Sequence, residues 1–115
     1  MTAMTPEEIV QAQYDAYNAQ DLDALCGHFA SDCKLATLNG DVYSEGLDAF
    51  RERHAALFAE FPQNRAILLS RMVIGDTVID HEDVERAPGT ERFQVAAIYT
   101  IKNGRVARVD YVVAS

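Results

Sequence analysis

The last third of the chain, residues 77 to 113, constrains the fold most, because two turn signals divide it into short apolar alternations. Asn103-Gly104 stands between two such alternations. A type I′ turn needs positive φ at both central residues, so this pair is the strongest short-range signal for a β-hairpin. Pro88-Gly89 marks the other turn. The segment therefore predicts three antiparallel strands joined by two tight hairpins.

The first half of the chain predicts helices. Thr5 can act as an N-cap, Pro6 suits the first helical position, and Glu8 completes a capping box. Apolar residues at helical spacing predict three helices, over residues 6–19, from Asp21 onward, and over 46–61, where Pro62 ends the last one. Further strands are predicted at residues 33–38 and 65–74.

The order of these elements is helix, helix, strand, helix and then four strands in hairpin succession. Helices segregated from a meandering antiparallel sheet are typical of an α+β fold, with the helices covering one concave face. A chain of 115 residues is long enough for one domain with a single core, so residues 1–115 are expected to form one domain.

Composition excludes several partners. The net charge is −8, with ten Lys and Arg against eighteen Asp and Glu. Such a chain lacks the basic patch that nucleic acids or anionic membranes require. There is no apolar run of membrane-spanning length and no basic-then-apolar leader, so a cytoplasmic protein is expected. Cys26 and Cys33 are expected to be reduced and buried.

Four stretches carry a resemblance to a known superfamily. They are residues 14–25 (YDAYNAQDLDAL), 29–32 (FASD), 45–46 (EG) and 98–106 (IYTIKNGRV). The chain resembles the nuclear transport factor two-like superfamily, a cone-shaped α+β fold that includes ketosteroid isomerase, SnoaL-like polyketide cyclases, limonene epoxide hydrolase and scytalone dehydratase. The resemblance implies a ligand-binding cup and specifies its chemistry poorly, because members share the cup and differ in its lining.

The residues of ketosteroid isomerase are absent. That enzyme uses an aspartate base with a tyrosine and a protonated aspartic acid as its oxyanion hole. In the resemblance these positions fall at Thr37, Gln13 and Ala97. Tyr14 is one residue from the tyrosine position, but one helical step turns a side chain by roughly 100°. Ketosteroid isomerisation is therefore disfavoured.

Strand alternation predicts which side chains line the cup. The predicted inner faces are Phe93, Val95, Ala97, Tyr99 and Ile101 in one strand and Ala107, Val109, Tyr111 and Val113 in the last. Helical residues complete the lining, and the predicted substrate-binding set is Gln13, Tyr14, Tyr17, His54, Tyr99 and Tyr111. Such a lining suits a small hydrophobic or amphipathic molecule.

The strand over residues 78–86 carries polar groups on both faces. The resemblance puts Ile79, His81, Asp83 and Glu85 inward and Asp80 and Glu82 outward, and a one-residue slip would exchange the two sets. Histidine transfers protons near neutral pH, and a carboxylate two residues along the same face lies about 6 to 7 Å away. The predicted catalytic residues are therefore His81 and Asp83.

A metal site and a cofactor are not expected. Neighbouring residues of the run His81-Glu82-Asp83 alternate faces, so they cannot all reach one ion without a bulge. The sequence also lacks a paired helical histidine motif, a phosphate-binding loop and a nucleotide fingerprint.

Two functions remain open. The first is a cofactor-independent isomerase, cyclase or dehydratase that acts by proton transfer on a small, mostly apolar carbonyl compound. The second is a non-catalytic ligand-binding or dimerisation module of the same fold. A homodimer is expected in either case, because the outer sheet face, with Val84, Ile98 and Val112, is more apolar than a solvated sheet needs to be.

Overall fold

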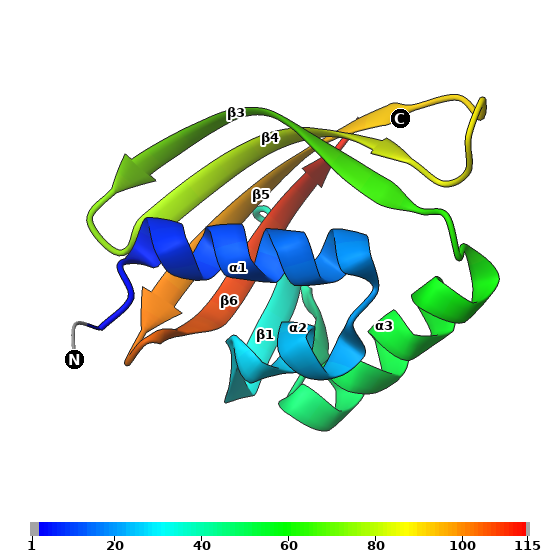
Figure 1. Ribbon diagram of the computed structural model, residues 1–115. Helices are drawn as coiled ribbons and strands as arrows, with labels where there is room; N and C mark the ends of the chain where they lie inside the picture. The colour runs from blue at the N-terminus through cyan, green and yellow to red at the C-terminus, as the bar shows by residue number, and fades with distance from the viewer. Residues whose placement is uncertain (1–2, 115) are drawn as a thin grey trace.

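The computed structural model describes residues 3–114, which form a six-stranded sheet and three helices (Figure 1). The helices and strands follow in the order α1 (Pro6–Ala19), α2 (Leu22–Gly27), β1 (Phe29–Thr37), β2 (Val42–Glu45), α3 (Leu47–Glu60), β3 (Arg65–Ile74), β4 (Thr77–Glu85), β5 (Phe93–Lys102) and β6 (Arg105–Val113). The predicted α+β class is confirmed. Strand β2 is an addition to the predicted elements, and β1 begins earlier than predicted.

The sheet has the strand order β2-β1-β6-β5-β4-β3. All neighbours are antiparallel except β1 and β6, which are parallel. Register shifts interrupt three antiparallel pairs, at residues 35/36, 68/70 and 100/101. Such irregularities bend strands and increase twist, and the sheet curves around the helices on its concave face (Figure 1).

The start of α1 agrees with its sequence signal. The Thr5 hydroxyl accepts a hydrogen bond from the Glu8 amide at 3.2 Å, and the Glu8 carboxylate accepts one from the Thr5 amide at 2.8 Å. This capping box fixes the register of the helix, which buries Ile9, Val10 and Gln13 against the sheet. Within residues 3–114 no helix has both the length and the apolar character needed to cross a membrane.

The two predicted turns differ in the structure. Asn103 and Gly104 have φ values of 52° and 76°, as a type I′ hairpin requires, and they join β5 directly to β6. The connection between β4 and β5 is longer and spans residues 86–92, with Gly89 at a φ of 82°. The prediction of a second tight hairpin was therefore wrong, because Pro88-Gly89 forms only part of a loop.

The predicted faces of β4 are exchanged. Its buried set is Val78, Asp80, Glu82 and Val84, which lie opposite Tyr99, Ala97, Val95 and Phe93 of the inner face of β5. Ile79, His81 and Asp83 therefore lie on the outer face, and Glu85 packs there against Arg65 and Arg92. The physical reason is the period of two, because a slip of one residue inverts every side chain of a strand.

A smaller correction applies to β6. The inward positions Val109, Tyr111 and Val113 agree with the prediction, but the register shift opposite Ile101 replaces Ala107 by Val106 as the fully buried residue. The core continues from Val106 toward α3, where the rings of Phe29 and Phe50 stack with centroids 4.0 Å apart.

Candidate functional site

A cavity of about 670 Å³ lies between the concave face of the sheet and helices α1 and α3. Its lining is mostly apolar, with a few polar groups, as is typical of small-molecule sites. The solvent-exposed members of the lining mark its mouth, and they are Thr37, Tyr43, Arg53, Ala56, Glu60 and Val113. The mouth therefore lies between α3 and the edge of the sheet formed by β1, β2 and the end of β6.

All six residues predicted to contact a ligand line this cavity, namely Gln13, Tyr14, Tyr17, His54, Tyr99 and Tyr111. The two predicted catalytic residues do not. His81 lies on the outer face of the sheet, where its Nε2 is 2.7 Å from Oε1 of Gln94, and Asp83 lies on the same face. The exchanged register of β4 therefore removes the geometric basis for a proton-transfer role of His81 and Asp83 in the cavity.

Glu82 takes the inward place in β4 that His81 was predicted to hold. Its side chain is buried and lines the cavity, and within residues 3–114 no hydrogen bond to its carboxyl group is found. Burial, and to a smaller degree the charge of Asp80, raises the pKa of Glu82 to about 7, while Arg71 opposes this increase. At neutral pH this carboxyl group is therefore divided between its acid and its base forms.

Asp80, the inward residue before Glu82, is held differently. Its two carboxylate oxygens accept hydrogen bonds from Nε and Nη2 of Arg71 at 2.7 and 3.0 Å. Nη1 of Arg71 also donates to Oε1 of Gln11 in α1 at 2.7 Å. Asp80 is fully buried, so this bidentate pair compensates a charge that would otherwise be costly to bury. Asp80 thus contributes a structural ion pair, whereas Glu82 remains available to the cavity.

The hydroxyl group of Tyr99 has a proton to donate to the cavity. Nε2 of Gln13 donates both to the carbonyl oxygen of Val10 at 3.1 Å and to the Tyr99 hydroxyl at 3.0 Å. A carbonyl only accepts, which fixes the orientation of the Gln13 amide and makes the Tyr99 oxygen an acceptor there. Burial raises the pKa of Tyr99 well above its ordinary value, so the hydroxyl stays protonated.

Tyr17 is arranged in the same way. Nη1 of Arg86 donates to Oδ1 of Asn64 at 2.8 Å, so the Asn64 amide nitrogen faces the Tyr17 hydroxyl, to which it donates at 2.8 Å. The Tyr17 oxygen therefore accepts, and its own O–H is directed elsewhere. Burial raises the pKa of Tyr17, against the opposing effect of the hydrogen bond from Asn64.

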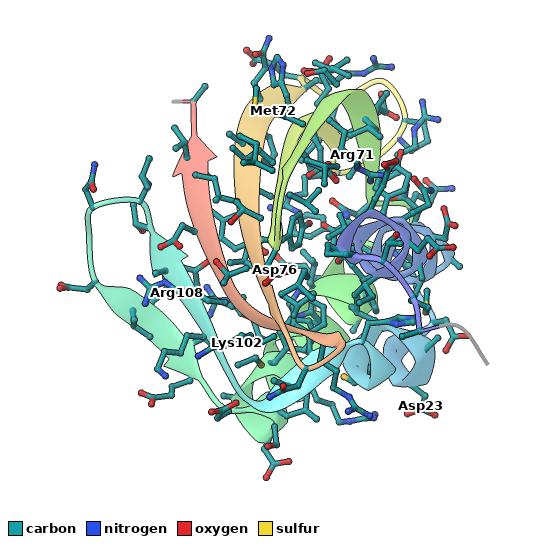
Figure 2. All side chains as sticks on the ribbon, turned by 90° about the vertical axis from the view of Figure 1, so that its left-hand side faces the viewer. Asp23, Arg71, Met72, Asp76, Lys102 and Arg108 are labelled. Atoms are coloured by element: carbon teal, nitrogen blue, oxygen red, sulfur yellow. The ribbon has the colours of Figure 1, made fainter. Side chains whose placement is uncertain are left out.

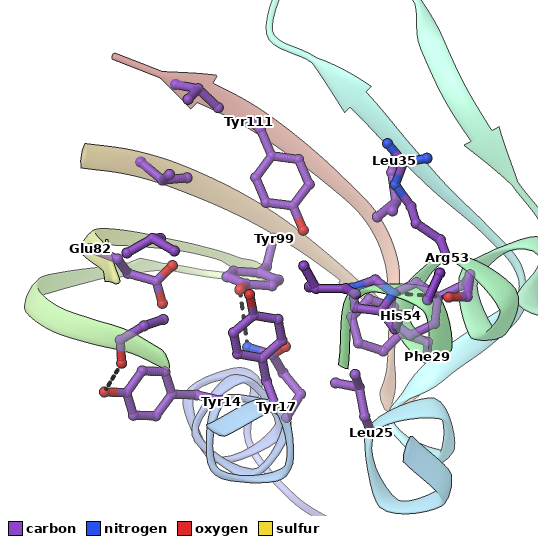
Figure 3. A pocket seen from close by; sticks show the side chains of 18 of the residues that line it. Tyr14, Tyr17, Leu25, Phe29, Leu35, Arg53, His54, Glu82, Tyr99 and Tyr111 are labelled. Atoms are coloured by element: carbon purple, nitrogen blue, oxygen red, sulfur yellow. Dashed lines mark hydrogen bonds between the residues drawn. The ribbon is translucent and has the colours of Figure 1, made fainter. Parts of the chain in front are cut away.

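His54 and Tyr111 complete the polar lining. Nδ1 of His54 lies 2.9 Å from the carbonyl oxygen of Phe50 and must donate to it, which leaves Nε2 as an acceptor. Burial lowers the pKa of His54, so its imidazole is neutral at pH 7. Burial raises the pKa of Tyr111 well above its ordinary value. Figure 3 shows the ends of Glu82, Tyr99, Tyr17 and Tyr111 directed into one space.

Tyr14 has a structural use for its hydroxyl group. This group donates to the carbonyl oxygen of Ala66 at 2.9 Å and accepts from the amide of Leu68 at 3.2 Å, so it fastens α1 to β3 (Figure 3). The ring of Tyr14 contributes to the cavity wall, and its hydroxyl is not free for a ligand.

Sequence reasoning missed four charged residues of the cavity, Glu82, Arg53, Arg86 and Glu60. One signal could have identified Glu82. The set Val78, Asp80, Glu82 and Val84 is bounded by an apolar residue at each end, whereas the alternative set begins with Ile79 and ends in Glu85. An inward face joins the apolar core at both ends, so the first set was the better candidate. Arg53 and Arg86 gave no comparable local signal.

Chemically, the site combines one carboxyl group poised near neutral pH with hydroxyl donors. Such an arrangement can take a proton from carbon and stabilise the resulting oxyanion. Within residues 3–114, no group of three or more His, Cys, Asp and Glu side chains is placed to hold a metal ion.

A curved sheet and helices that together enclose a mostly apolar cavity define the class of cone-shaped α+β folds. The chain belongs to the SnoaL-like domain family, whose model matches residues 10–109. This confirms the predicted nuclear transport factor two-like superfamily. No curated protein matches the chain significantly.

Solved structures agree with this assignment. An uncharacterized cystatin-fold protein from Novosphingobium aromaticivorans is 34% identical, with a TM-score of 0.89 over 96% of this chain and 99% of its own. A candidate polyketide cyclase from Sinorhizobium meliloti is 30% identical, with a TM-score of 0.77 over 90% and 93% of the two chains. A SnoaL-like protein of unknown function from Burkholderia thailandensis, 16% identical with a TM-score of 0.81 over 100% and 99%, shares the fold.

Proposed function

We propose that the cavity binds a small, mostly apolar carbonyl compound and that Glu82 transfers a proton on it, without a cofactor. The observation that carries this proposal is a buried carboxyl group that faces the cavity, has no hydrogen-bond partner among residues 3–114 and has a pKa raised to about 7. A general acid or base works best when its pKa is near the working pH. The likeness to a candidate polyketide cyclase agrees with chemistry of this kind.

The proposed reaction begins at a carbon next to the substrate carbonyl. The carboxylate of Glu82 takes the α-proton, the C–H electron pair forms the enolate, and the hydroxyl groups of Tyr17, Tyr99 or Tyr111 donate hydrogen bonds to the enolate oxygen. The protonated Glu82 then returns its proton, at another carbon in an isomerisation or to a leaving oxygen in a dehydration. In a cyclisation the enolate carbon attacks a second carbonyl instead, and Glu82 protonates the new alkoxide.

The test is exchange of α-protons in deuterated water over a panel of enolisable ketones and small lactones. Glu82→Gln is expected to lower the exchange rate by about 10²-fold or more while the fold and ligand binding remain. His81→Gln is the matched control on the outer face of the same strand, and we expect it to exchange at the wild-type rate. Equal rates in wild type and Glu82→Gln would contradict the role of Glu82.

Binding without exchange would replace this proposal by the alternative of a non-catalytic ligand-binding module. The three residue positions that differ from ketosteroid isomerase, Thr37, Gln13 and Ala97, favour this alternative. The panel separates the two functions, because a ligand that binds measurably and shows no exchange above buffer fits only a binding protein.

The proposal includes a homodimer formed through the outer face of the sheet. Met72 in β3 and Val112 in β6 expose 55% and 43% of their surface on this face, and the half-buried Ile79 and Ile98 lie on the two strands between them. Val84, predicted for the same surface, lines the cavity instead. Figure 2 shows the helices on one side of the sheet and Arg108, which pairs with Asp110, on the other. Sedimentation at micromolar concentration should give a dimer, and Met72→Glu a monomer; a monomeric wild type would contradict this assembly.

Two further points of the proposal concern the whole chain. We take residues 1–115 as one SnoaL-like domain, since the family model matches residues 10–109. We also propose the cytoplasm as its compartment, because Cys26 and Cys33 are both free and buried.

A further inference from the structure

Arginine side chains in this acidic protein fall into two groups. Five of the eight arginines form ion pairs with Asp or Glu, namely Arg51, Arg65, Arg71, Arg92 and Arg108. Within residues 3–114, Arg53, Arg86 and Arg105 have no carboxylate at ion-pair distance. Two of these three, Arg53 and Arg86, line the cavity. In a chain with eighteen acidic residues, unpaired cations at the cavity suggest that a ligand supplies the missing anion.

Arg86 is held in a fixed position without using up its donors. Its guanidinium group lies 5.0 Å from the centroid of the Phe93 ring and 5.4 Å from that of Phe61, and Nη1 donates to Asn64. The guanidinium group also lies close enough to the Tyr17 hydroxyl to lower the pKa of Tyr17, but within the described residues no carboxylate lies at ion-pair distance from it. A planar group held in this way can offer two parallel N–H donors, the geometry that a carboxylate accepts.

Arg53, the second unpaired arginine of the lining, also lies against an aromatic ring. It is exposed at the mouth of the cavity, and its guanidinium group lies 4.7 Å from the centroid of the Tyr43 ring. Glu60 is the acidic residue of the same mouth and opposes this positive potential. Glu82, His54 and Tyr99 are buried and therefore lie deeper than these exposed groups. Arg53 thus stands at the opening, Arg86 is half-buried in the cavity wall, and the proton-transfer groups are buried inside.

We propose that the ligand of this cavity is a keto acid, or a related carbonyl compound with a carboxylate tail. Its carbonyl end reaches Glu82 and the tyrosines, its apolar body fills the middle of the cavity, and its carboxylate binds Arg86, with Arg53 adding positive potential. The inference rests on the proposed function for the position of the carbonyl group, but carboxylate recognition by Arg86 is a separate property of the same cavity.

The experiment uses two probes that differ in one group. 4-Oxo-4-phenylbutanoate carries a ketone, a phenyl ring and a carboxylate, and 4-oxo-4-phenylbutanamide replaces the carboxylate with a neutral amide. Calorimetric titration of the full chain should give at least tenfold tighter binding of the acid. Arg86→Met keeps an apolar stem and removes the charge. It should therefore weaken binding of the acid at least tenfold and change binding of the amide less than twofold.

Three further variants separate recognition from packing. Arg105→Met is the matched control, because Arg105 also has no ion pair in the described part of the chain and does not line the cavity. We expect this variant to bind both probes as wild type does. Glu60→Gln removes the opposing charge, so it should tighten binding of the acid and leave binding of the amide unchanged. Arg86→Lys keeps the charge but not the two parallel donors, so its affinity for the acid should fall between wild type and Arg86→Met. This variant also keeps the proposal testable if Arg86→Met does not fold.

The outcomes distinguish the two proposals. Equal affinity of wild type for the acid and the amide would overturn the carboxylate inference. An equal loss of affinity for both probes in Arg86→Met would do the same. So would wild-type affinity for the acid in both Arg86→Lys and Arg86→Met. The α-protons of the same probes report on Glu82 independently. Acid-selective binding without exchange would refute proton transfer by Glu82 and support carboxylate recognition by Arg86. Exchange on both probes with equal affinity would support proton transfer and refute carboxylate recognition.

Discussion

Strand β4 presents acidic side chains on both faces, and the two faces differ in what surrounds these groups. On the outer face Asp83 is partly exposed and His81 is hydrogen-bonded to Gln94. On the inner face Asp80 is fully buried in an ion pair, and Glu82 is buried without one. Burial and the charge of Asp80, rather than residue type, therefore raise the pKa of Glu82.

The two inner acids, Asp80 and Glu82, also differ from each other. Asp80 has a bidentate arginine and serves the packing of α1 against β3 through Gln11. Glu82 lies on the same face and is also buried, but it forms no ion pair with an arginine among the described residues. Pairing with an arginine therefore marks Asp80 as a structural acid, and the lack of such a pair marks Glu82 as a candidate catalytic one.

The largest expected effect concerns stability at Asp80. Asp80→Asn leaves the mostly buried guanidinium of Arg71 without its carboxylate, and removing one partner of a buried pair costs roughly 3–5 kcal/mol of unfolding free energy. Asp83→Asn on the outer face should change it by about 0.5 kcal/mol or less. Urea denaturation of both variants measures the difference.

A double variant tests whether the loss of stability in Asp80→Asn comes from the unpaired charge. Replacing both partners, with Arg71→Met and Asp80→Leu together, should recover most of the stability, because two apolar side chains leave no buried charge. Equal losses in Asp80→Asn and Asp83→Asn would show that the two faces of β4 do not differ as described.

The next effect is the pH dependence of stability that Glu82 produces. Its pKa is raised from 4.5 to about 7 in the folded state, so below pH 4.5 the group is protonated in both states. Between pH 4.5 and 7 the unfolded chain releases this proton while the folded chain keeps it, so the unfolding free energy falls as the pH rises. At about 1.4 kcal/mol per unit, the loss is roughly 3 kcal/mol by pH 8.

Glu82→Gln should remove this contribution and therefore be more stable than wild type at pH 8 but not at pH 4. The measurement is the difference in unfolding free energy between variant and wild type at several pH values, in which the other titrating groups cancel. His81→Gln, the control on the outer face of the same strand, should keep the difference in slope that Glu82 produces. A difference between Glu82→Gln and wild type that does not change with pH would argue against a raised pKa.

Local signals in the sequence were sufficient for much of the fold. The capping box at Thr5 and the Asn103-Gly104 hairpin depend on neighbouring residues, so both were predicted from the sequence. The inner face of β5 followed from apolar alternation, and with it Tyr99. Strand β2 was missed because it is short, lies at the sheet edge and is mostly exposed, which leaves no buried alternation to detect.

The candidate site was harder to predict because its decisive features are not local. A two-residue turn would have fixed the pairing of β4 with β5, but the connection over residues 86–92 does not, so the faces of β4 stayed ambiguous. The chain of contacts from Arg86 through Asn64 to Tyr17 joins three segments far apart in sequence. Only the folded chain brings Arg86 and Tyr17 to one cavity.

The proposed proton transfer depends most directly on the protonation of Glu82. Carbon-13 NMR of the protein labelled at its glutamate side-chain carboxyls, titrated from pH 3 to 9, reports every glutamate at once. One carboxyl should titrate near pH 7 in wild type and in His81→Gln and be absent from the spectrum of Glu82→Gln. If every glutamate carboxyl titrates below about pH 5, the inner face of β4 does not hold a neutral-pH acid, and the central claim is wrong.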